Sequence, residues 1–136
     1  MPLHRVTSAI EFCYGHRLLG HEGKCRHLHG HNGLVEVDVD AETLDQLGMV
    51  MDFTDVRDKV KGWIDENIDH RMVLARGDPA VQPLTDLGEP LYLLDENPTA
   101  ENLARHIHDG LAQQGLVLAE VRLWETPSSY ATYRVG

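Results

Sequence analysis

Residues 29–41 read HGHNGLVEVDVDA and contain the clearest structural signal in the chain. From residue 35 onward Val35, Val37 and Val39 alternate with acidic residues, which is the period of two that a half-buried β-strand shows. His29 and His31 stand where the chain enters this strand. Side chains at i and i+2 of a strand point to the same side. The stretch therefore predicts a strand with two converging imidazoles at its beginning.

Upstream of this strand the sequence predicts one more strand and a loop. Residues 3–13 mix Val6, Ile10 and Phe12 with polar positions and are typical of a strand. Residues 14–31 are rich in glycine and histidine without regular periodicity, which indicates a loop.

Downstream, apolar residues recur at helical spacing twice. The first helix is indicated by Val56, Val60 and Ile64, with Thr54 or Asp55 available as its cap. Residues 72–97 contain three prolines and two glycines, so we expect a long irregular excursion there.

The second helix begins after Asn97-Pro98-Thr99 and ends near Gly115. Alternating apolar residues over 117–123 predict a third strand, and residues 130–135 predict a closing strand after a turn at Pro127-Ser128-Ser129.

The element order is therefore ββααββ in a single domain covering residues 1–136. Strands joined in sequence at each end favour an α+β fold: a four-stranded antiparallel sheet with both helices on one face. The opposite face would stay partly bare. A bare apolar face is typical of association with other copies, so we expect an oligomer.

Composition excludes several classes of function. Twelve Lys and Arg against 22 Asp and Glu give a formal net charge of −10, which argues against binding nucleic acid or an anionic membrane. No apolar run approaches the roughly 20 residues of a membrane span, and residues 1–5 lack the apolar segment of a signal peptide. Two cysteines form no disulfide framework, so we expect a cytoplasmic protein.

Histidine is the unusual component: five of nine histidines lie between residues 16 and 31. His29 and His31 with His16, which follows the first strand, offer three nitrogens, and three imidazoles with a free fourth position suit catalytic Zn²⁺. Copper, nickel or iron would also accept them. The competing interpretation is a set of solvated loop histidines. Spacing alone leaves other candidate ligands open, namely His21, His27, Glu11, Glu22 and Glu36.

Cys25 and the pair Asp69-His70 are candidates for proton transfer. Cys25 is flanked by Lys24 and Arg26, and positive neighbours favour the thiolate. A carboxylate can orient an imidazole that shuttles protons, but Asp69 and His70 would reach the metal loop only across the fold or across a subunit boundary. The alternatives are that Cys25 is a small buried residue without a chemical role, and that Asp69 is a helix cap beside a surface His70.

Two further residues are candidate ligand contacts. Glu125, at the end of the third strand, could accept two parallel hydrogen bonds from an amidine-like ring edge, such as that of a pterin or guanine. Thr99 could add a contact from the start of the second helix. The alternatives are that Glu125 is a solvated residue at the end of a strand and that Thr99 is an ordinary helix cap. Cys13, in the first strand among apolar neighbours, we expect to be inert.

Several segments together resemble the family of 6-pyruvoyltetrahydropterin and 6-carboxytetrahydropterin synthases. They occur in family order from residue 12 to residue 126. The matching pieces are Phe12-x-x-x-His16, Cys25-x-x-x-His29-Gly30-His31-Asn32, Met49-Val50-Met51-Asp52-Phe53, Asp69-His70, Asn97-Pro98-Thr99-x-Glu101-Asn102 and Trp124-Glu125-Thr126.

The resemblance implies roles for these residues. His16, His29 and His31 would hold zinc, Cys25 would be the general base, and Asp69 with His70 would complete the proton relay. Glu125 would bind the amino and imino edge of the pterin, with Thr99 beside it. The implied architecture is the tunnelling fold (T-fold), in which subunits join into a barrel, with hexamers made of two trimers and sites between subunits.

The implied substrate is 7,8-dihydroneopterin triphosphate. Members of the queuosine branch give 6-carboxy-5,6,7,8-tetrahydropterin with loss of acetaldehyde and triphosphate, and this is the product we favour. Other members stop at 6-pyruvoyltetrahydropterin, and those with Glu in or near the cysteine position feed folate synthesis. Here Cys25 is present, although Glu22 lies nearby. Arg17, Lys24, Arg26 and His27 are candidates for holding the triphosphate.

Two departures from the family pattern stand out. Tyr14-Gly15 replaces a small, alanine-rich pair before His16, and residues 72–97 are longer than the link in compact bacterial members. Two other classes of function stay open: a non-catalytic zinc or pterin-binding module, and a zinc hydrolase that uses only the three histidines and a water.

Overall fold

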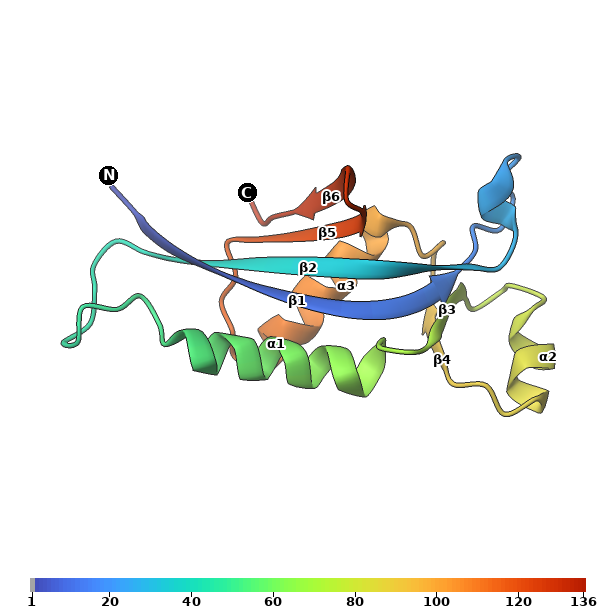
Figure 1. Cartoon of the computed structure of the whole chain (residues 1–136), viewed down its shortest axis with the longest axis horizontal. Coiled ribbons are helices and arrows are strands. Elements are labelled where there is room, and N and C mark those ends of the chain that lie inside the picture. Colours follow the sequence, from blue (N-terminus) through green and yellow to red (C-terminus); the bar gives the residue numbers. More distant parts are fainter. Residues whose placement is uncertain (1) are drawn as a thin grey trace.

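Two long strands form the centre of the structure, a computed structural model that describes residues 2–136 (Figure 1). Strand β1 (His4–His16) pairs antiparallel with β2 (His29–Ala41) over its whole length, from His4 opposite Ala41 to His16 opposite His29. The predicted loop, residues 14–31, is too long, because β1 continues to His16 and β2 already begins at His29. The loop between them contains a short 3₁₀ helix at Lys24–Arg26.

The sheet has six strands in the order β4-β3-β1-β2-β5-β6. β5 (Glu120–Thr126) and β6 (Ser129–Tyr133) extend it antiparallel beyond β2, as the alternating pattern predicted. On the other side β3 (Met72–Ala75) and β4 (Leu91–Leu94) add parallel pairs. The prediction of four antiparallel strands is therefore incomplete, because the expected irregular excursion contributes two strands and helix α2 (Val81–Asp86).

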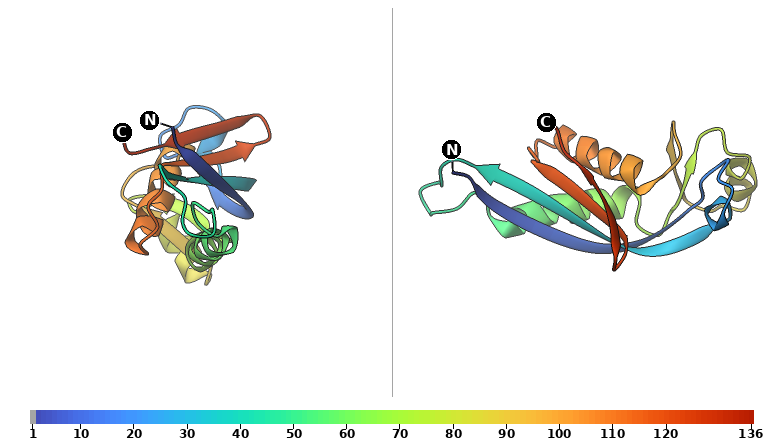
Figure 2. Two further views of the ribbon diagram at one scale, coloured as in Figure 1. Left: turned by 90° about the vertical axis from the view of Figure 1, so that its left-hand side faces the viewer. Right: turned by 90° about the horizontal axis from the view of Figure 1, so that it is seen from above.

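Both main helices lie on one face of the sheet, as predicted (Figure 2). Helix α1 (Phe53–Asn67) buries Val56, Val60 and Ile64, and α3 (Ala100–Gln113) buries Leu103, Ile107 and Leu111. They cover the alternate strand residues that face them, among them Ile10, Val35, Val37 and Leu123. No helix within residues 2–136 is long and apolar enough to cross a bilayer.

The helix ends follow ordinary capping chemistry. The cap of α1 is Asp52, whose carboxylate accepts the Thr54 N–H, rather than Thr54 or Asp55. Thr99 caps α3, and Gly115, just past its end, has a φ of 85° that favours glycine.

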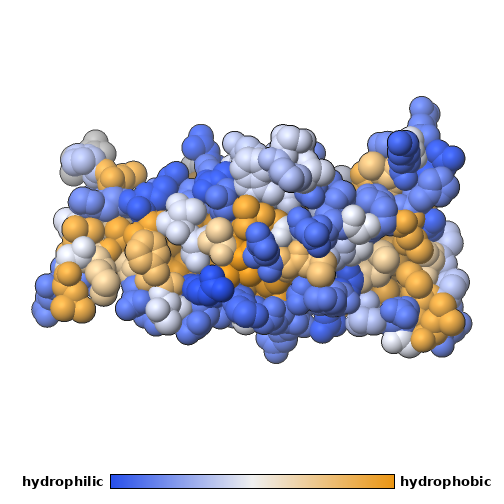
Figure 3. All heavy atoms as spheres, in the orientation of Figure 1, coloured by the Kyte–Doolittle hydropathy of each residue, from blue (hydrophilic) through white to orange (hydrophobic). Residues whose placement is uncertain are grey.

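The opposite face of the sheet is charged rather than simply apolar. Figure 3 shows hydrophobic and hydrophilic residues mixed on the side where the strands lie in front of α3. Asp38 of β2, whose side chain is fully buried, binds Arg122 of β5 through two hydrogen bonds of 2.6 and 3.0 Å and accepts one from Thr7 of β1. Burial alone raises the pKa of Asp38, but these hydrogen bonds outweigh it and lower the pKa below its usual value.

Candidate metal centre and active site

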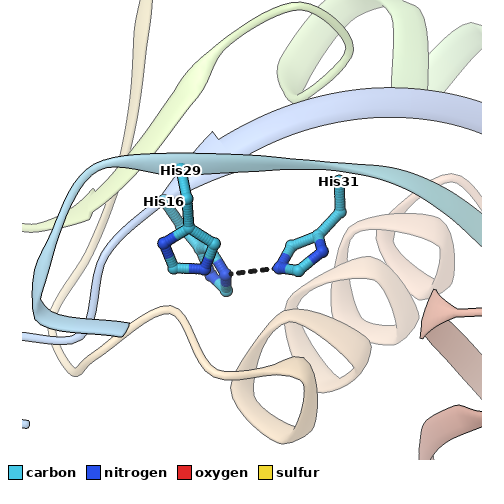
Figure 4. A group of neighbouring side chains, drawn as sticks. All are labelled: His16, His29 and His31. Carbon is cyan, nitrogen blue, oxygen red and sulfur yellow. Dashed lines mark hydrogen bonds between the residues drawn. The ribbon is translucent and has the colours of Figure 1, made fainter. Parts of the chain in front are cut away.

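Three imidazoles converge at one end of the central strand pair. His16 ends β1, while His29 and His31 begin β2, and antiparallel pairing brings all three to the helix-covered face. Figure 4 shows the rings turned toward one another. Their ligand nitrogens all lie within 4.8 Å of one another, and Nε2 of His16 is 3.1 Å from Nε2 of His31. Two ligands on a tetrahedral zinc ion are separated by about 3.3 Å. The geometry therefore suits one metal ion.

Backbone carbonyls orient two of these rings. Nδ1 of His16 lies 2.7 Å from the Pro98 carbonyl oxygen, and Nδ1 of His29 lies 2.7 Å from that of His27. Each ring donates its Nδ1–H there, so the lone pair of the neutral ring is on Nε2, facing the cluster. Second contacts of this kind are usual for metal-binding histidines.

Burial keeps the central ring neutral. His16 is 2% exposed, and this burial is the largest influence lowering its pKa from the ordinary value near 6.5. The neighbouring His29 and His31 lower the pKa further, while the Pro98 hydrogen bond and Glu125 oppose the shift. A neutral imidazole is the form that binds a metal, so the donor set fits Zn²⁺.

The segment Asn97-Pro98-Thr99 fixes this end of the molecule. Asn97 exchanges two hydrogen bonds with the backbone of Leu19, at 3.0 and 2.9 Å, and so ties down the loop between β1 and β2. Pro98 accepts the hydrogen bond from His16, and Thr99 caps α3 through its hydroxyl oxygen. Thr99, predicted as a ligand contact, is occupied as a cap at the edge of the site.

Glu125 lies directly beside the histidine cluster. Its Oε2 is 3.5 Å from Nε2 of His31, and its side chain is 28% exposed. It also lines a cleft of about 390 Å³ at the beginning of α3, together with Ala100, Glu101 and Tyr130. The predicted carboxylate therefore faces both the metal cluster and a space that a planar ring could enter.

Cys25 belongs to neither of the two clusters of possible metal ligands in the described residues. These clusters are His16, His29 and His31, and Cys13, Asp69 and His70. It lies in the 3₁₀ helix of the loop, half-buried, and its carbonyl accepts the Leu18 N–H. Nearby, Arg17, Arg26 and His27 line a cleft of about 400 Å³. Within this group Arg17 is paired with the buried Asp78. Of the basic residues predicted to meet a triphosphate, Arg17 is thus already paired.

Asp69 and His70 lie on the opposite side of the sheet from the histidine cluster. They follow α1, and His70 Nδ1 is 3.0 Å from Asp69 Oδ2. Both meet Cys13, whose side chain points away from the helices: Cys13 Sγ is 3.4 Å from His70 Nε2. The expectation that Asp69 and His70 form a pair is met, but one chain does not bring them to Cys25.

Sequence reasoning missed the surroundings of Cys13 and Tyr14. Cys13 was expected to be inert, and its contact with His70 depends on the β1 register. Tyr14 is 3% exposed and packs edge-on against His16, with ring centroids 5.3 Å apart. Its ring lies over Gly33, where an added Cβ would be 3.0 Å from Tyr14 Cε1. The only signal was the departure from a small residue at position 14.

Comparison with known proteins places this site in a family. The family model described as 6-pyruvoyl tetrahydropterin synthase matches residues 5–135. The chain belongs to this family. A relative from Rickettsia bellii named 6-carboxy-5,6,7,8-tetrahydropterin synthase is 39% identical over 133 residues, covering 93% of this chain and 96% of its own. A protein of the same name from Aquifex aeolicus is 38% identical over 124 residues, covering 82% and 76%.

Solved structures agree on the T-fold. An uncharacterized protein from Wolinella succinogenes superposes with a TM-score of 0.80 at 26% identity, over 98% of this chain and 99% of that one. The 6-pyruvoyl tetrahydropterin synthase of Caenorhabditis elegans gives 0.74 at 25% identity, over 100% and 98%. The predicted α+β tunnelling fold is confirmed, with two more strands than expected.

Proposed function

We propose that this member of the 6-pyruvoyl tetrahydropterin synthase family is a zinc-dependent lyase that converts 7,8-dihydroneopterin triphosphate into 6-carboxy-5,6,7,8-tetrahydropterin, releasing acetaldehyde and triphosphate. The convergence of His16, His29 and His31 next to Glu125 carries the proposal. Relatives at 30–39% identity that bear the name of this synthase support the choice of product.

The site offers two adjacent binding groups. Bound zinc would act as a Lewis acid toward the side-chain hydroxyls of the substrate. Glu125 would accept two parallel N–H hydrogen bonds from the amino and imino edge of the pterin, a charge-assisted arrangement that selects for ring orientation. Thr99 lies at the beginning of α3, where its side chain caps the helix.

Proton transfer would involve Cys25 as general base with Asp69 and His70. Asp69 Oδ2 lies 3.0 Å from Nδ1 of His70, so the carboxylate would orient the imidazole and stabilise its charged form. The Cys25 thiolate would remove a carbon-bound proton, and His70 would return a proton to the product. Since Asp69 and His70 lie on the far face from the histidine cluster, this relay requires a second subunit.

The proposed assembly is a hexamer built as a dimer of trimers, in which sheets join edge to edge into a barrel. Two features support it. Within the described residues, β4 and β6 each pair on one side only, so both outer edges of the sheet are open to another chain. In addition, the site residues are divided between the two faces of one sheet, so a complete site would need residues from two subunits.

The decisive experiment incubates zinc-loaded protein with 7,8-dihydroneopterin triphosphate and identifies the pterin by mass spectrometry. We expect 6-carboxytetrahydropterin with stoichiometric acetaldehyde; a pyruvoyl product would assign the other branch.

Cys25→Ala should lower turnover by at least about a hundredfold while zinc stays near one per subunit. Unchanged turnover in that variant would reject Cys25 as the base. Binding of the pterin without any product would indicate a non-catalytic module. Hydrolysis that Glu125→Ala leaves unchanged would indicate a zinc hydrolase.

A further inference from the structure

Tyr14 lies beside the histidine cluster but has no part in the proposed reaction. It stands two residues before His16 on β1, so both side chains point to the helix-covered face. Across the ladder between β1 and β2 it is paired with His31. Its side chain is buried and belongs to the hydrophobic core. Tyr14 is therefore placed where the core meets the candidate metal ligands.

The Tyr14 ring contacts two of the three candidate ligands. Its centroid is 5.3 Å from that of His16, with the ring planes at 74°, and 5.6 Å from that of His31, with the planes at 44°. Aromatic pairs interact at centroid separations of about 4.5–7 Å. Among the aromatic pairs of residues 2–136, no other ring from outside the cluster meets either histidine. Both imidazoles thus pack against the same side chain.

Gly33 on β2 makes room for the Tyr14 ring. A Cβ added at this position would lie 3.0 Å from Cε1 of Tyr14 and 3.2 Å from Cε1 of Phe12. Carbon atoms in favourable contact are about 3.5–4.0 Å apart. Any larger residue at position 33 would therefore push against the Tyr14 ring, so the place of the ring depends on this glycine.

His31 depends most on a packing contact. The rings of His16 and His29 each have Nδ1 at 2.7 Å from a backbone carbonyl oxygen. Within residues 2–136, the polar contacts of His31 are made by Nε2, which faces His16 and Glu125. Metal-binding histidines usually have their second nitrogen held by a neighbouring group. For His31, packing against Tyr14 takes the place of that hydrogen bond.

We propose that Tyr14 is a positioning residue for the metal centre: its ring holds the imidazoles of His16 and His31 in place, so that the site is preorganised before an ion binds. The ring rather than the hydroxyl makes these contacts, because the hydroxyl has no partner within residues 2–136. The inference rests on the metal binding in the proposed function and not on the product. A residue that only filled the core could be replaced by another apolar residue without changing metal affinity.

The test compares Tyr14→Phe with Tyr14→Leu, because both lack the hydroxyl and only the first keeps the aromatic ring. Metal-free protein is titrated with Co²⁺, and binding is read from the visible absorption of the bound ion. We expect Tyr14→Leu to raise the Kd at least about tenfold and to change the absorption bands, as loss of a contact to a metal-binding histidine does. Tyr14→Phe should keep the wild-type bands and a Kd within twofold of wild type.

Tyr92→Leu is the matched control for lost packing. Tyr92 also meets a histidine edge-on, His106 at 5.9 Å and 89°, but that histidine lies outside the cluster. This variant should lose stability to urea and keep the wild-type Kd for Co²⁺. A wild-type Kd and spectrum in Tyr14→Leu would overturn the inference. Equal weakening of Co²⁺ binding in Tyr14→Leu and either Tyr14→Phe or Tyr92→Leu would overturn it too.

Gly33→Ala decides the question if Tyr14→Leu does not fold. The added methyl group pushes against the Tyr14 ring while every aromatic side chain remains. We expect the Kd for Co²⁺ to rise several-fold, and an unchanged Kd would overturn the inference. None of these titrations needs a pterin. A wild-type protein that binds Co²⁺ and forms no product would reject the lyase assignment alone, whereas one that binds no metal would overturn both.

Discussion

Tyr14 carries a hydroxyl that is buried without a partner among residues 2–136. Its ring is held between Phe12 and His16 over Gly33, and burial, reinforced by the charge of Glu125, raises its pKa. An unsatisfied buried hydroxyl costs about 1–3 kcal/mol. We therefore expect Tyr14→Phe to raise the free energy of unfolding of the metal-free protein by about 1 kcal/mol, measured by urea denaturation.

Tyr92 provides the matched control. Its hydroxyl is paired with Nδ1 of His106 at 3.3 Å, so Tyr92→Phe should lower stability by about 0.5–1 kcal/mol. If Tyr14→Phe also destabilised the protein, the hydroxyl of Tyr14 would have a bonding partner in solution.

Among single residues, the sequence predicted those whose spacing along the chain determines the direction of their side chains. His29 and His31 share a side because a strand has a period of two, and the structure brings His16 to them as predicted. The contact between Cys13 and His70 could not be predicted. It joins residues 57 positions apart, and it depends on the left-handed φ of His70 after the end of α1.

Helices α1 and α3 contact each other through a glycine and an indole. A Cβ added at Gly110 of α3 would lie 2.3 Å from Nε1 of Trp63 in α1, and Trp63 is 7% exposed with little room to move. Helix propensity alone predicts that Gly→Ala stabilises by about 1 kcal/mol. We expect the opposite for Gly110→Ala, a loss of about 1–3 kcal/mol from overpacking, measured by thermal and urea unfolding.

Gly62 of α1 is the control because a Cβ there meets nothing within 4 Å. Gly62→Ala should stabilise the protein by up to about 1 kcal/mol. Stabilisation by both substitutions would mean that α1 and α3 are not packed at Gly110 as described.

Helix positions followed from apolar spacing, but β3 and β4 did not. Each has four residues, MVLA and LYLL, too few to show a period, and prolines and glycines surround them. Their pairing is parallel and depends on β1, since Gly15 lies opposite Met72 and His16 opposite Val73. Such an element is stabilised by tertiary contacts rather than by its local sequence.

Over the whole molecule, the candidate site residues are divided between the two faces of one sheet. The histidine cluster lies with α1 and α3, and the Asp69-His70 pair lies on the open face beside Cys13. If both groups serve one reaction, each site combines the metal ligands of one subunit with the His70 of another. Two inactive variants should then complement each other when their subunits mix in one oligomer.

We expect His29→Ala and His70→Ala to be inactive separately and active when coexpressed. A site is complete only where a subunit with intact His29 meets a neighbour with intact His70, which random mixing in equal amounts produces at about one site in four. The mixed oligomer should therefore show about a quarter of wild-type turnover and about half the zinc. Refolded mixtures of separately purified oligomers provide the same test, and unmixed oligomers are the control. Activity that stays at the level of the single variants, in oligomers proven to contain both, would mean that each site is built from a single chain.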